Sequence, residues 1–167
     1  MLMSPNLIAL GGLPGSGKTT LARLLAQRLT AVHLRIDTIE QGLRATGISR
    51  VGVAGYVIAQ RLAADNLSLG RSVIADCVNP VRESRAAWHA VATAAGTPII
   101  EIEIACSDPA QHRARIETRG ADIPGHVLPN WEDVQTLAYE PWPGALRIDT
   151  AGRGAEETVA AILKQIA

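Results

Sequence analysis

The sequence predicts an α/β fold in which one parallel β-sheet is covered by helices on both faces. Short apolar runs rich in β-branched residues alternate with longer segments of helical period, and this alternation is typical of parallel sheets. One strand-to-helix junction also carries a glycine-rich pattern. Hydrophobic residues make up 47% of the 167 residues and charged residues 19%, which is a globular composition rather than that of a disordered chain. We therefore expect a single domain over residues 1–167.

The apolar, β-branched runs predict strands that are buried on both faces of the sheet. Five strands are expected, at residues 6–10, 32–36, 72–75, 98–105 and 145–148. Helices are expected between and after them, at residues 18–29, 53–69, 80–95, 109–119 and 154–166. Pro80 and Pro109 suit a first helical turn. Two further segments, 41–52 and 120–129, contain several Gly or Pro residues, so we expect them to be mobile connections. Ligands of parallel sheets bind at loops near the strand ends.

The charge balance argues against several classes of partner. Sixteen basic and sixteen acidic residues give no net charge, so the chain as a whole does not attract nucleic acid or an anionic membrane. Residues 1–12 lack the charged start of a signal peptide, and no apolar run approaches the roughly 20 residues of a membrane span. We expect a cytoplasmic protein. Cys77 and Cys106 have no CxxC spacing, which favours structural thiols over a metal or redox site.

The strongest motif is GLPGSGKT at residues 12–19, which matches the phosphate-binding loop GxxxxGK[ST] between a strand and a helix. Its glycines let backbone N–H groups turn toward phosphates, and the helix N-terminus adds positive potential. Lys18 is expected to reach the β- and γ-phosphates, and the Thr19 hydroxyl to coordinate Mg²⁺. The expected nucleotide-binding residues are Gly12, Leu13, Pro14, Gly15, Ser16, Gly17, Lys18, Thr19 and Thr20. No NKxD segment for guanine is present, so ATP is favoured over GTP.

Together with three later features, this motif resembles the small P-loop kinases. GLPGSGKTT is followed by a short strand ending in Asp37, then by VIADCVNP, then by an arginine-containing helix and a Gly/Pro loop. The combination is most similar to relatives of chloramphenicol phosphotransferase, the zeta toxins and the kinase domain of polynucleotide kinase. The resemblance implies a P-loop NTPase three-layer sandwich with strand order 2-3-1-4-5 and a mobile lid at about residues 115–130. It also implies that residues 150–153 border the adenine.

Asp37 follows the second strand, at the sheet edge where the phosphate-binding loop also lies. A carboxylate there can orient an acceptor hydroxyl and take its proton, which is the role that the resemblance implies. Asp37 could instead cap a helix that begins near Ile39, with Glu40 completing a capping box. The two interpretations are compatible. Arg35 points to the same side of an extended strand, so it could contact the acceptor or pair with a carboxylate.

Asp76 ends the third strand, as the acidic residue of a Walker B element does. Asp76 is expected to bind Mg²⁺ or substrate. Alternatively, it is a buried residue that accepts hydrogen bonds and has only a structural role. Asn79 and Arg82 follow near the next helix N-terminus and could bind an anionic or hydroxyl-rich acceptor. Arg82 and Arg85 lie three residues apart and share a helix face, where they could equally be solvated.

Arg115 and Arg119 share a helix face just before the Gly/Pro loop. Lid closure could bring such a guanidinium to the transferring phosphoryl group, whose negative charge it would stabilise. Arg119 could alternatively stack on the adenine. Alternatively, the two arginines lie on an exposed helix without a functional role and form surface ion pairs with Glu117. His112 is expected at the surface, and His126 in the loop is a weak candidate for acceptor binding.

These features predict a kinase that transfers the γ-phosphoryl group of Mg·ATP to a hydroxyl of a small-molecule acceptor. The expected catalytic residues are Lys18, Asp37, Arg115 and Arg119, and Arg119 also counts among the nucleotide-binding residues. The expected substrate-binding residues are Arg35, Asp37, Asp76, Asn79 and Arg82, and the expected metal ligands are Thr19 and Asp76. Two alternatives stay open: a zeta-toxin-like kinase that acts on a nucleotide-sugar, and a regulatory P-loop ATPase. A homodimer or an antitoxin partner is undecided, and a nucleic-acid acceptor is disfavoured because the chain is not basic.

Overall fold

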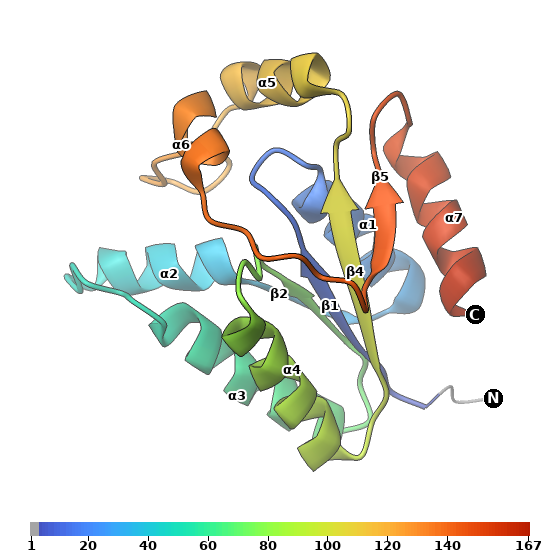
Figure 1. Cartoon of the computed structure of the whole chain (residues 1–167). Coiled ribbons are helices and arrows are strands. Elements are labelled where there is room, and N and C mark those ends of the chain that lie inside the picture. Colours follow the sequence, from blue (N-terminus) through green and yellow to red (C-terminus); the bar gives the residue numbers. More distant parts are fainter. Residues whose placement is uncertain (1–3) are drawn as a thin grey trace.

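A five-stranded parallel sheet forms the centre of the computed structural model, which describes residues 4–167 (Figure 1). The strand order β2-β3-β1-β4-β5 is the predicted one. The strands are β1 (Leu7–Gly11), β2 (Val32–Arg35), β3 (Val73–Asp76), β4 (Ile99–Ala105) and β5 (Leu146–Asp149). Each agrees with its predicted bounds to within a residue. The first three residues of the N-terminal stretch considered above lie outside the described part.

Helices cover both faces of this sheet and also its carboxyl edge (Figure 1). They are α1 (Lys18–Leu29), α2 (Ile36–Ala45), α3 (Ala54–Ser68), α4 (Arg82–Ala95), α5 (Pro109–Thr118), α6 (Trp131–Thr136) and α7 (Ala155–Ile166). Residues of α3 and α4 join one hydrophobic core, and residues of α1 and α7 join the other. The helices α5 and α6 lie beyond the carboxyl ends of β4 and β5.

The central strand β1 explains why the sheet has two cores. Its residues alternate between the faces, so Leu7 packs with α3 and α4 while Ile8 and Leu10 pack with α1 and α7. All five residues of β1 are buried. Burial on both faces explains why this strand is a continuous apolar run instead of an alternating one. It ends at the glycine-rich loop, which is thereby anchored at the middle of the sheet.

Three local expectations are wrong at the second strand and the fourth helix. The segment expected to be a mobile connection from residue 41 begins inside α2, which continues to Ala45. Asp37 is not a cap: α2 begins at Ile36, and Glu40 pairs with Arg44 at 3.5 Å instead of completing a capping box. Pro80 lies outside α4, which begins at Arg82. Ile36 is the one buried residue of α2, and its assignment to the preceding strand left too few apolar positions to indicate a helix there.

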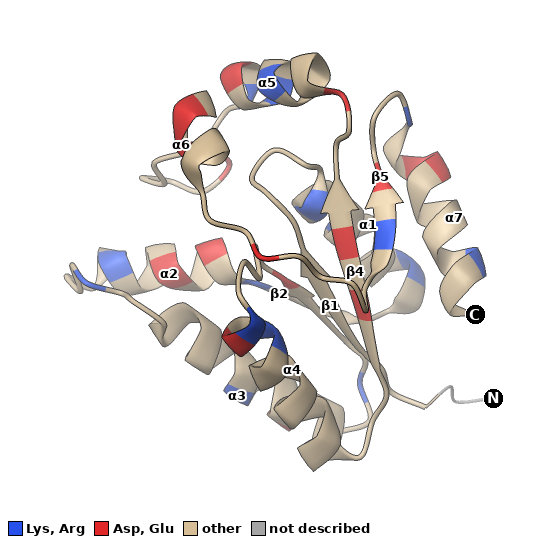
Figure 2. Cartoon of the chain, viewed as in Figure 1, with Lys and Arg blue, Asp and Glu red and all other residues tan. Residues whose placement is uncertain are grey.

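Charged residues of both signs occur together on several helices. Figure 2 shows acidic and basic residues together on α2, α4, α5 and α7. This mixing agrees with the zero net charge of the chain. None of the helices in residues 4–167 combines the length and the apolar composition that a membrane crossing requires.

Candidate active site

The glycine-rich loop connects β1 to α1 and has the backbone that its sequence requires. Gly12, Gly15 and Gly17 all have positive φ, at 139°, 77° and 103°. A Cβ atom on Gly12 would lie 2.1 Å from the carbonyl oxygen of Ile104, so no other residue fits there. The loop therefore packs tightly against β4 while its last glycine begins α1. This is the strand, loop and helix context that the motif predicts.

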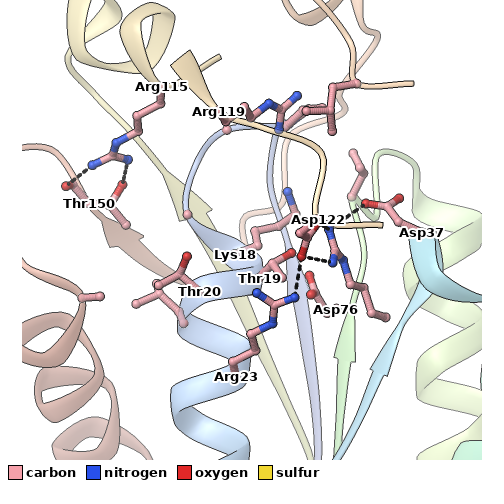
Figure 3. Close-up of a pocket in the computed structure, with 18 of the residues that line it drawn as sticks. Lys18, Thr19, Thr20, Arg23, Asp37, Asp76, Arg115, Arg119, Asp122 and Thr150 are labelled. Carbon is pink, nitrogen blue, oxygen red and sulfur yellow. Dashed lines mark hydrogen bonds and ion pairs between the residues drawn. The ribbon is translucent and has the colours of Figure 1, made fainter. Parts of the chain in front are cut away.

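A cavity of about 750 Å³ opens beside this loop at the carboxyl edge of the sheet (Figure 3). Its lining comes from the loop, from the ends of β2 and β3, from α5 and from the segment after α5. The sequence-predicted residues that line it are Pro14, Gly15, Gly17, Lys18, Thr19, Thr20, Arg35, Asp37, Asp76, Arg115 and Arg119. Thr150 and Arg153, from the segment expected to border the adenine, also line it. The fold thus brings most of the predicted site residues together.

Lys18 is buried and bends back over the loop that precedes it. Its Nζ donates a hydrogen bond to the carbonyl oxygen of Leu13 at 3.0 Å. Burial lowers the pKa of Lys18, while the carboxylates of Asp76 and Asp37 act in the opposite direction. The ammonium group therefore has one neutral partner and lies in the field of two acidic residues. Anionic phosphates would be a stronger partner than a carbonyl oxygen.

Asp76 lies at the end of β3 with 3% of its surface exposed. Its Oδ2 lies 3.1 Å from Nε2 of His33 on the neighbouring strand β2. Sequence analysis did not identify His33 as the partner that orients this carboxylate. Thr19 lines the same cavity, so a hydroxyl and a carboxylate are available there as oxygen ligands. This donor set fits Mg²⁺, which usually takes one or two carboxylates and completes its shell with phosphates and water.

No group of three or more His, Cys, Asp or Glu side chains within residues 4–167 is arranged to hold a metal by itself. The two cysteines are free: Cys77 is buried and Cys106 is half-buried. Any Mg²⁺ at Thr19 and Asp76 would therefore depend on a bound nucleotide for further ligands. Such dependence is ordinary for magnesium sites in proteins that bind nucleoside triphosphates.

Asp37 faces the cavity from the first turn of α2. Its side chain is 46% exposed, and its Oδ2 lies 3.9 Å from Nη2 of Arg35 and 4.0 Å from Nε2 of His126. His126 belongs to the segment between α5 and α6, residues 119–130, which we call the lid loop. A partly exposed carboxylate at the cavity wall, next to a guanidinium, is accessible to a hydroxyl group. Both Arg35 and Asp37 reach the cavity, although Asp37 does so from a helix and not from a strand.

The two lid arginines have different environments. Arg115 Nη1 donates to Thr150 Oγ1 at 2.8 Å and Nη2 donates to the Thr150 carbonyl oxygen at 3.0 Å. Arg115 therefore links α5 to the loop after β5. Arg119 donates one hydrogen bond of 3.3 Å from Nη2 to the Pro129 carbonyl oxygen, and its buried Nε has no partner. Of the two guanidinium groups, that of Arg119 is the less engaged.

Two residues that sequence analysis missed hold the lid loop over the cavity (Figure 3). The Asp122 carboxylate lies 2.7 Å and 3.1 Å from the two terminal nitrogens of Arg35. Arg23 of α1 donates a further hydrogen bond to Asp122 Oδ2 at 2.5 Å. Hydrogen bonds from Arg35 and then from Arg23 hold the pKa of Asp122 well below its usual range. The carboxylate is thus charged at neutral pH.

Asn79 and Arg82 are not brought to the cavity. The fully buried Asn79 donates from Nδ2 to the Leu10 carbonyl oxygen at 2.8 Å and accepts at Oδ1 from Trp88 Nε1 at 3.2 Å. Its φ of 49° turns the chain sharply after β3. Arg82 has an 89% exposed side chain, with its Nε 4.0 Å from a Glu140 oxygen. These surroundings favour a structural role for Asn79 and the solvated interpretation for Arg82.

Arg85 is a structural residue. It is 5% exposed and donates hydrogen bonds to the backbone carbonyl groups of Asn79, Pro80, Glu140 and Pro141. Its guanidinium carbon also lies 4.7 Å from the ring centre of Trp142 and 5.2 Å from that of Tyr139. Arg85 therefore connects the start of α4 to the segment that leads into β5. Tyr139 and Trp142 pack around this guanidinium.

We expect Arg85→Lys to lower the free energy of unfolding by about 3 kcal/mol. The lysine ammonium group cannot donate hydrogen bonds to all four carbonyl groups that the planar guanidinium group reaches. Urea denaturation followed by circular dichroism measures the change. Arg82→Lys is the matched control, since its side chain is exposed and we expect little change there. Equal stability of the two variants would contradict the role of Arg85.

His112 is buried, so the expectation of a surface position is wrong. It has 6% of its surface exposed, and its Nε2 lies 2.7 Å from the Pro14 carbonyl oxygen. Its ring meets that of Trp131 edge-on, with 5.2 Å between the ring centres. His112 thereby joins α5 and α6 to the phosphate-binding loop. A single histidine on a polar helix carries no sequence pattern that would reveal such a contact.

Known proteins share this architecture. A family model described as AAA domain matches residues 7–137, which is well over half of the chain. The UPF0200 protein of Aeropyrum pernix is 33% identical in an alignment 107 residues long, and the match covers 53% of this chain and 57% of that protein. The chain thus matches little more than half the length of this relative.

Two solved structures match nearly the full length of the chain. A proposed kinase from Chloroflexus aurantiacus J-10-fl superposes with a TM-score of 0.78 and 25% identity, over 97% of this chain and 98% of that one. The APS kinase CysC of Mycobacterium tuberculosis, in complex with AMPPNP and APS, gives a TM-score of 0.74 at 20% identity over 98% of each chain. The second likeness shows the fold alone. By its matching family model, this chain belongs to the AAA domain family, and its fold is that of the P-loop kinases.

Proposed function

We propose that this protein is an ATP-dependent kinase that transfers the γ-phosphoryl group of Mg·ATP to a hydroxyl of a small-molecule acceptor. One observation carries the proposal: Lys18 of the phosphate-binding loop and Asp37, a candidate general base, line the same cavity under the lid loop. A nucleotide and a second ligand could both reach this space. The nucleotide complex of the APS kinase, which has the same fold, supports ATP as the donor.

On this proposal, the nucleotide end of the cavity binds the phosphates of ATP. Backbone N–H groups of the loop and the start of α1 would surround them, and Lys18 would exchange the Leu13 carbonyl oxygen for phosphate oxygens. Thr19 and Asp76 would hold Mg²⁺, with His33 fixing the Asp76 carboxylate. The metal would supply positive charge between the β- and γ-phosphates. Nothing in this arrangement requires Asn79 or Arg82.

The acceptor would bind beside Asp37. The Asp37 carboxylate would orient the hydroxyl and take its proton as the new oxygen–phosphorus bond forms. The bond between the γ-phosphorus and the β,γ-bridging oxygen would break in the same transfer, and ADP would leave. Arg119 is the better placed of the two lid arginines to stabilise the transferring group, because Arg115 is already bound to Thr150. Arg115 would then support the nucleotide end of the cavity.

The test is ADP release from Mg·ATP in the presence of pooled acceptors: aminoglycosides, phenicols, macrolides, sugars, nucleosides and nucleotide-sugars. We expect one pool to stimulate ADP release and to yield a phosphorylated acceptor that mass spectrometry detects. The nucleotide-sugar pool covers a zeta-toxin-like acceptor. Intact ATP binding without stimulation by any pool, or by the anionic acceptors named below, would contradict the proposal and favour the regulatory ATPase.

A further inference from the structure

The cavity carries more positive charge than a nucleotide site requires. Three acidic side chains line it, against six cationic ones: Lys18, Arg23, Arg35, Arg115, Arg119 and Arg153. Lys18 belongs to the phosphate-binding loop, and Arg115 and Arg153 are associated with the loop after β5. Arg23 and Arg35 belong to neither group, and both of them bind Asp122 of the lid loop.

Arg35 depends on Asp122 for its counter-charge. The Arg35 side chain is only 12% exposed, and its Nε is a buried donor without a partner. Two terminal nitrogens bind Asp122 in a bidentate pair, whereas the Asp37 carboxylate lies 3.9 Å away. A guanidinium with so little exposure favours a bound anion over an unpaired state. Any movement of Asp122 away from Arg35 therefore leaves a site for another anion.

Asp122 lies where an acceptor would have to bind. In Figure 3 Asp122 lies close to Arg23, with Lys18 and Asp37 nearby, and its carboxylate also binds Arg35. Asp122 is 41% exposed and belongs to the lid loop rather than to the sheet or the core helices. A ligand that reaches Asp37 from this end of the cavity takes the space of the Asp122 carboxylate. Such a ligand must also replace its charge.

We propose that Arg35 and Arg23 form an anion subsite for the acceptor, and that Asp122 occupies this subsite in its absence. This inference rests on the proposed kinase function and narrows the acceptor to a molecule that carries both a hydroxyl and a phosphate, sulfate or carboxylate group. The bidentate geometry that Arg35 now offers to Asp122 suits each of these anions. An anion held by Arg35 places the rest of a small acceptor next to Asp37, two residues along the chain.

The first test measures binding of inorganic sulfate by equilibrium dialysis, at constant ionic strength and with saturating Mg·AMPPNP to fill the phosphate-binding loop. We expect Asp122→Asn to bind sulfate about tenfold more tightly than the wild type, because an intramolecular competitor has been removed. Arg35→Gln should lose this binding. The exposed pair Arg28 and Glu156, which are 2.7 Å apart, supplies the controls Arg28→Gln and Glu156→Gln, both expected to match the wild type.

The second test compares matched acceptors in the ADP-release assay: sugars with sugar phosphates, sugar sulfates and sugar acids, and nucleosides with nucleoside monophosphates. We expect an anionic member to be preferred, and Arg35→Gln to remove this preference by raising KM for that member more than it lowers kcat. The preferred member shows whether the subsite binds a phosphate, a sulfate or a carboxylate group. A neutral acceptor preferred equally by wild type and Arg35→Gln would overturn the inference.

The two tests separate this inference from the proposed function. Equal sulfate affinity in the wild type, Asp122→Asn and Arg35→Gln would overturn the anion subsite, whatever the transfer assays show. The expected sulfate result without transfer to any acceptor would support the subsite and overturn the kinase proposal. Thermal unfolding of each variant checks that a loss of sulfate affinity does not result from unfolding of the protein.

Discussion

Lys18→Ala should weaken binding of Mg·ATP and lower its turnover by about 100-fold or more, because the variant lacks the cation expected to contact the β- and γ-phosphates. The side chain is buried beside the loop and now contacts only a carbonyl oxygen there, so its charge is available to an incoming anion. Isothermal titration with Mg·AMPPNP measures the affinity, and ADP release measures the turnover.

Lys164→Ala is the control for this change, since Lys164 is an exposed residue of α7 outside the cavity. Its affinity and turnover should equal those of the wild type. Circular dichroism of Lys18→Ala should show a folded protein. Normal Mg·ATP binding by Lys18→Ala would show that the cavity does not bind the phosphates as we propose.

Asp37→Asn should leave the affinity for Mg·ATP unchanged and lower phosphoryl transfer by about 100-fold to 10,000-fold, the range typical of a lost general base. Asparagine keeps the size of the side chain but cannot take the hydroxyl proton. The partial exposure of Asp37 means that this substitution leaves no buried group without a partner. Single-turnover transfer to the stimulating acceptor measures the effect on the chemical step.

Asp65→Asn is the matched control, because Asp65 is an exposed residue of α3 outside the cavity. We expect transfer by this variant at the wild-type rate. An Asp37→Asn enzyme with unchanged turnover would exclude Asp37 as the base. It would leave Asp37 only a role in the local electrostatics of Lys18 and Arg35.

The sheet could be predicted from the sequence because its inner strands β1 and β3 are buried on both faces and therefore consist of apolar runs. The strands β2, β4 and β5 are only partly buried. The phosphate-binding loop was predictable because its glycines have conformations that other residues rarely adopt. The helix α2 was predicted only as an alternative, because Ile36 was assigned to the preceding strand. Ile39 and Leu43 were then the remaining apolar positions, too few to establish a helical period.

The contacts of the candidate site were less predictable than its members. Asp122 and Arg35 are 87 residues apart, and no pattern in the sequence pairs a loop aspartate with one arginine among many. Asn79 and Arg82 show a related limit. Their position near a helix start suggested a ligand site, but the turn at Asn79 directs its side chain into the core. Which way a side chain points there depends on tertiary packing, which the sequence pattern does not record.

The packing of α5 on the phosphate-binding loop limits where the lid can bend. His112 contacts the Pro14 carbonyl oxygen, and a Cβ atom on Gly15 would lie 2.5 Å from Ile116 Cδ1, so the loop and this helix touch along two turns. The base of the lid therefore cannot move outward without disturbing the loop that we propose binds the phosphates. Hinge motion is left to the dozen residues after Thr118. Substitutions in that short stretch should change the rates at which ligands bind and dissociate. Substitutions in α5 should instead change the affinity for the nucleotide.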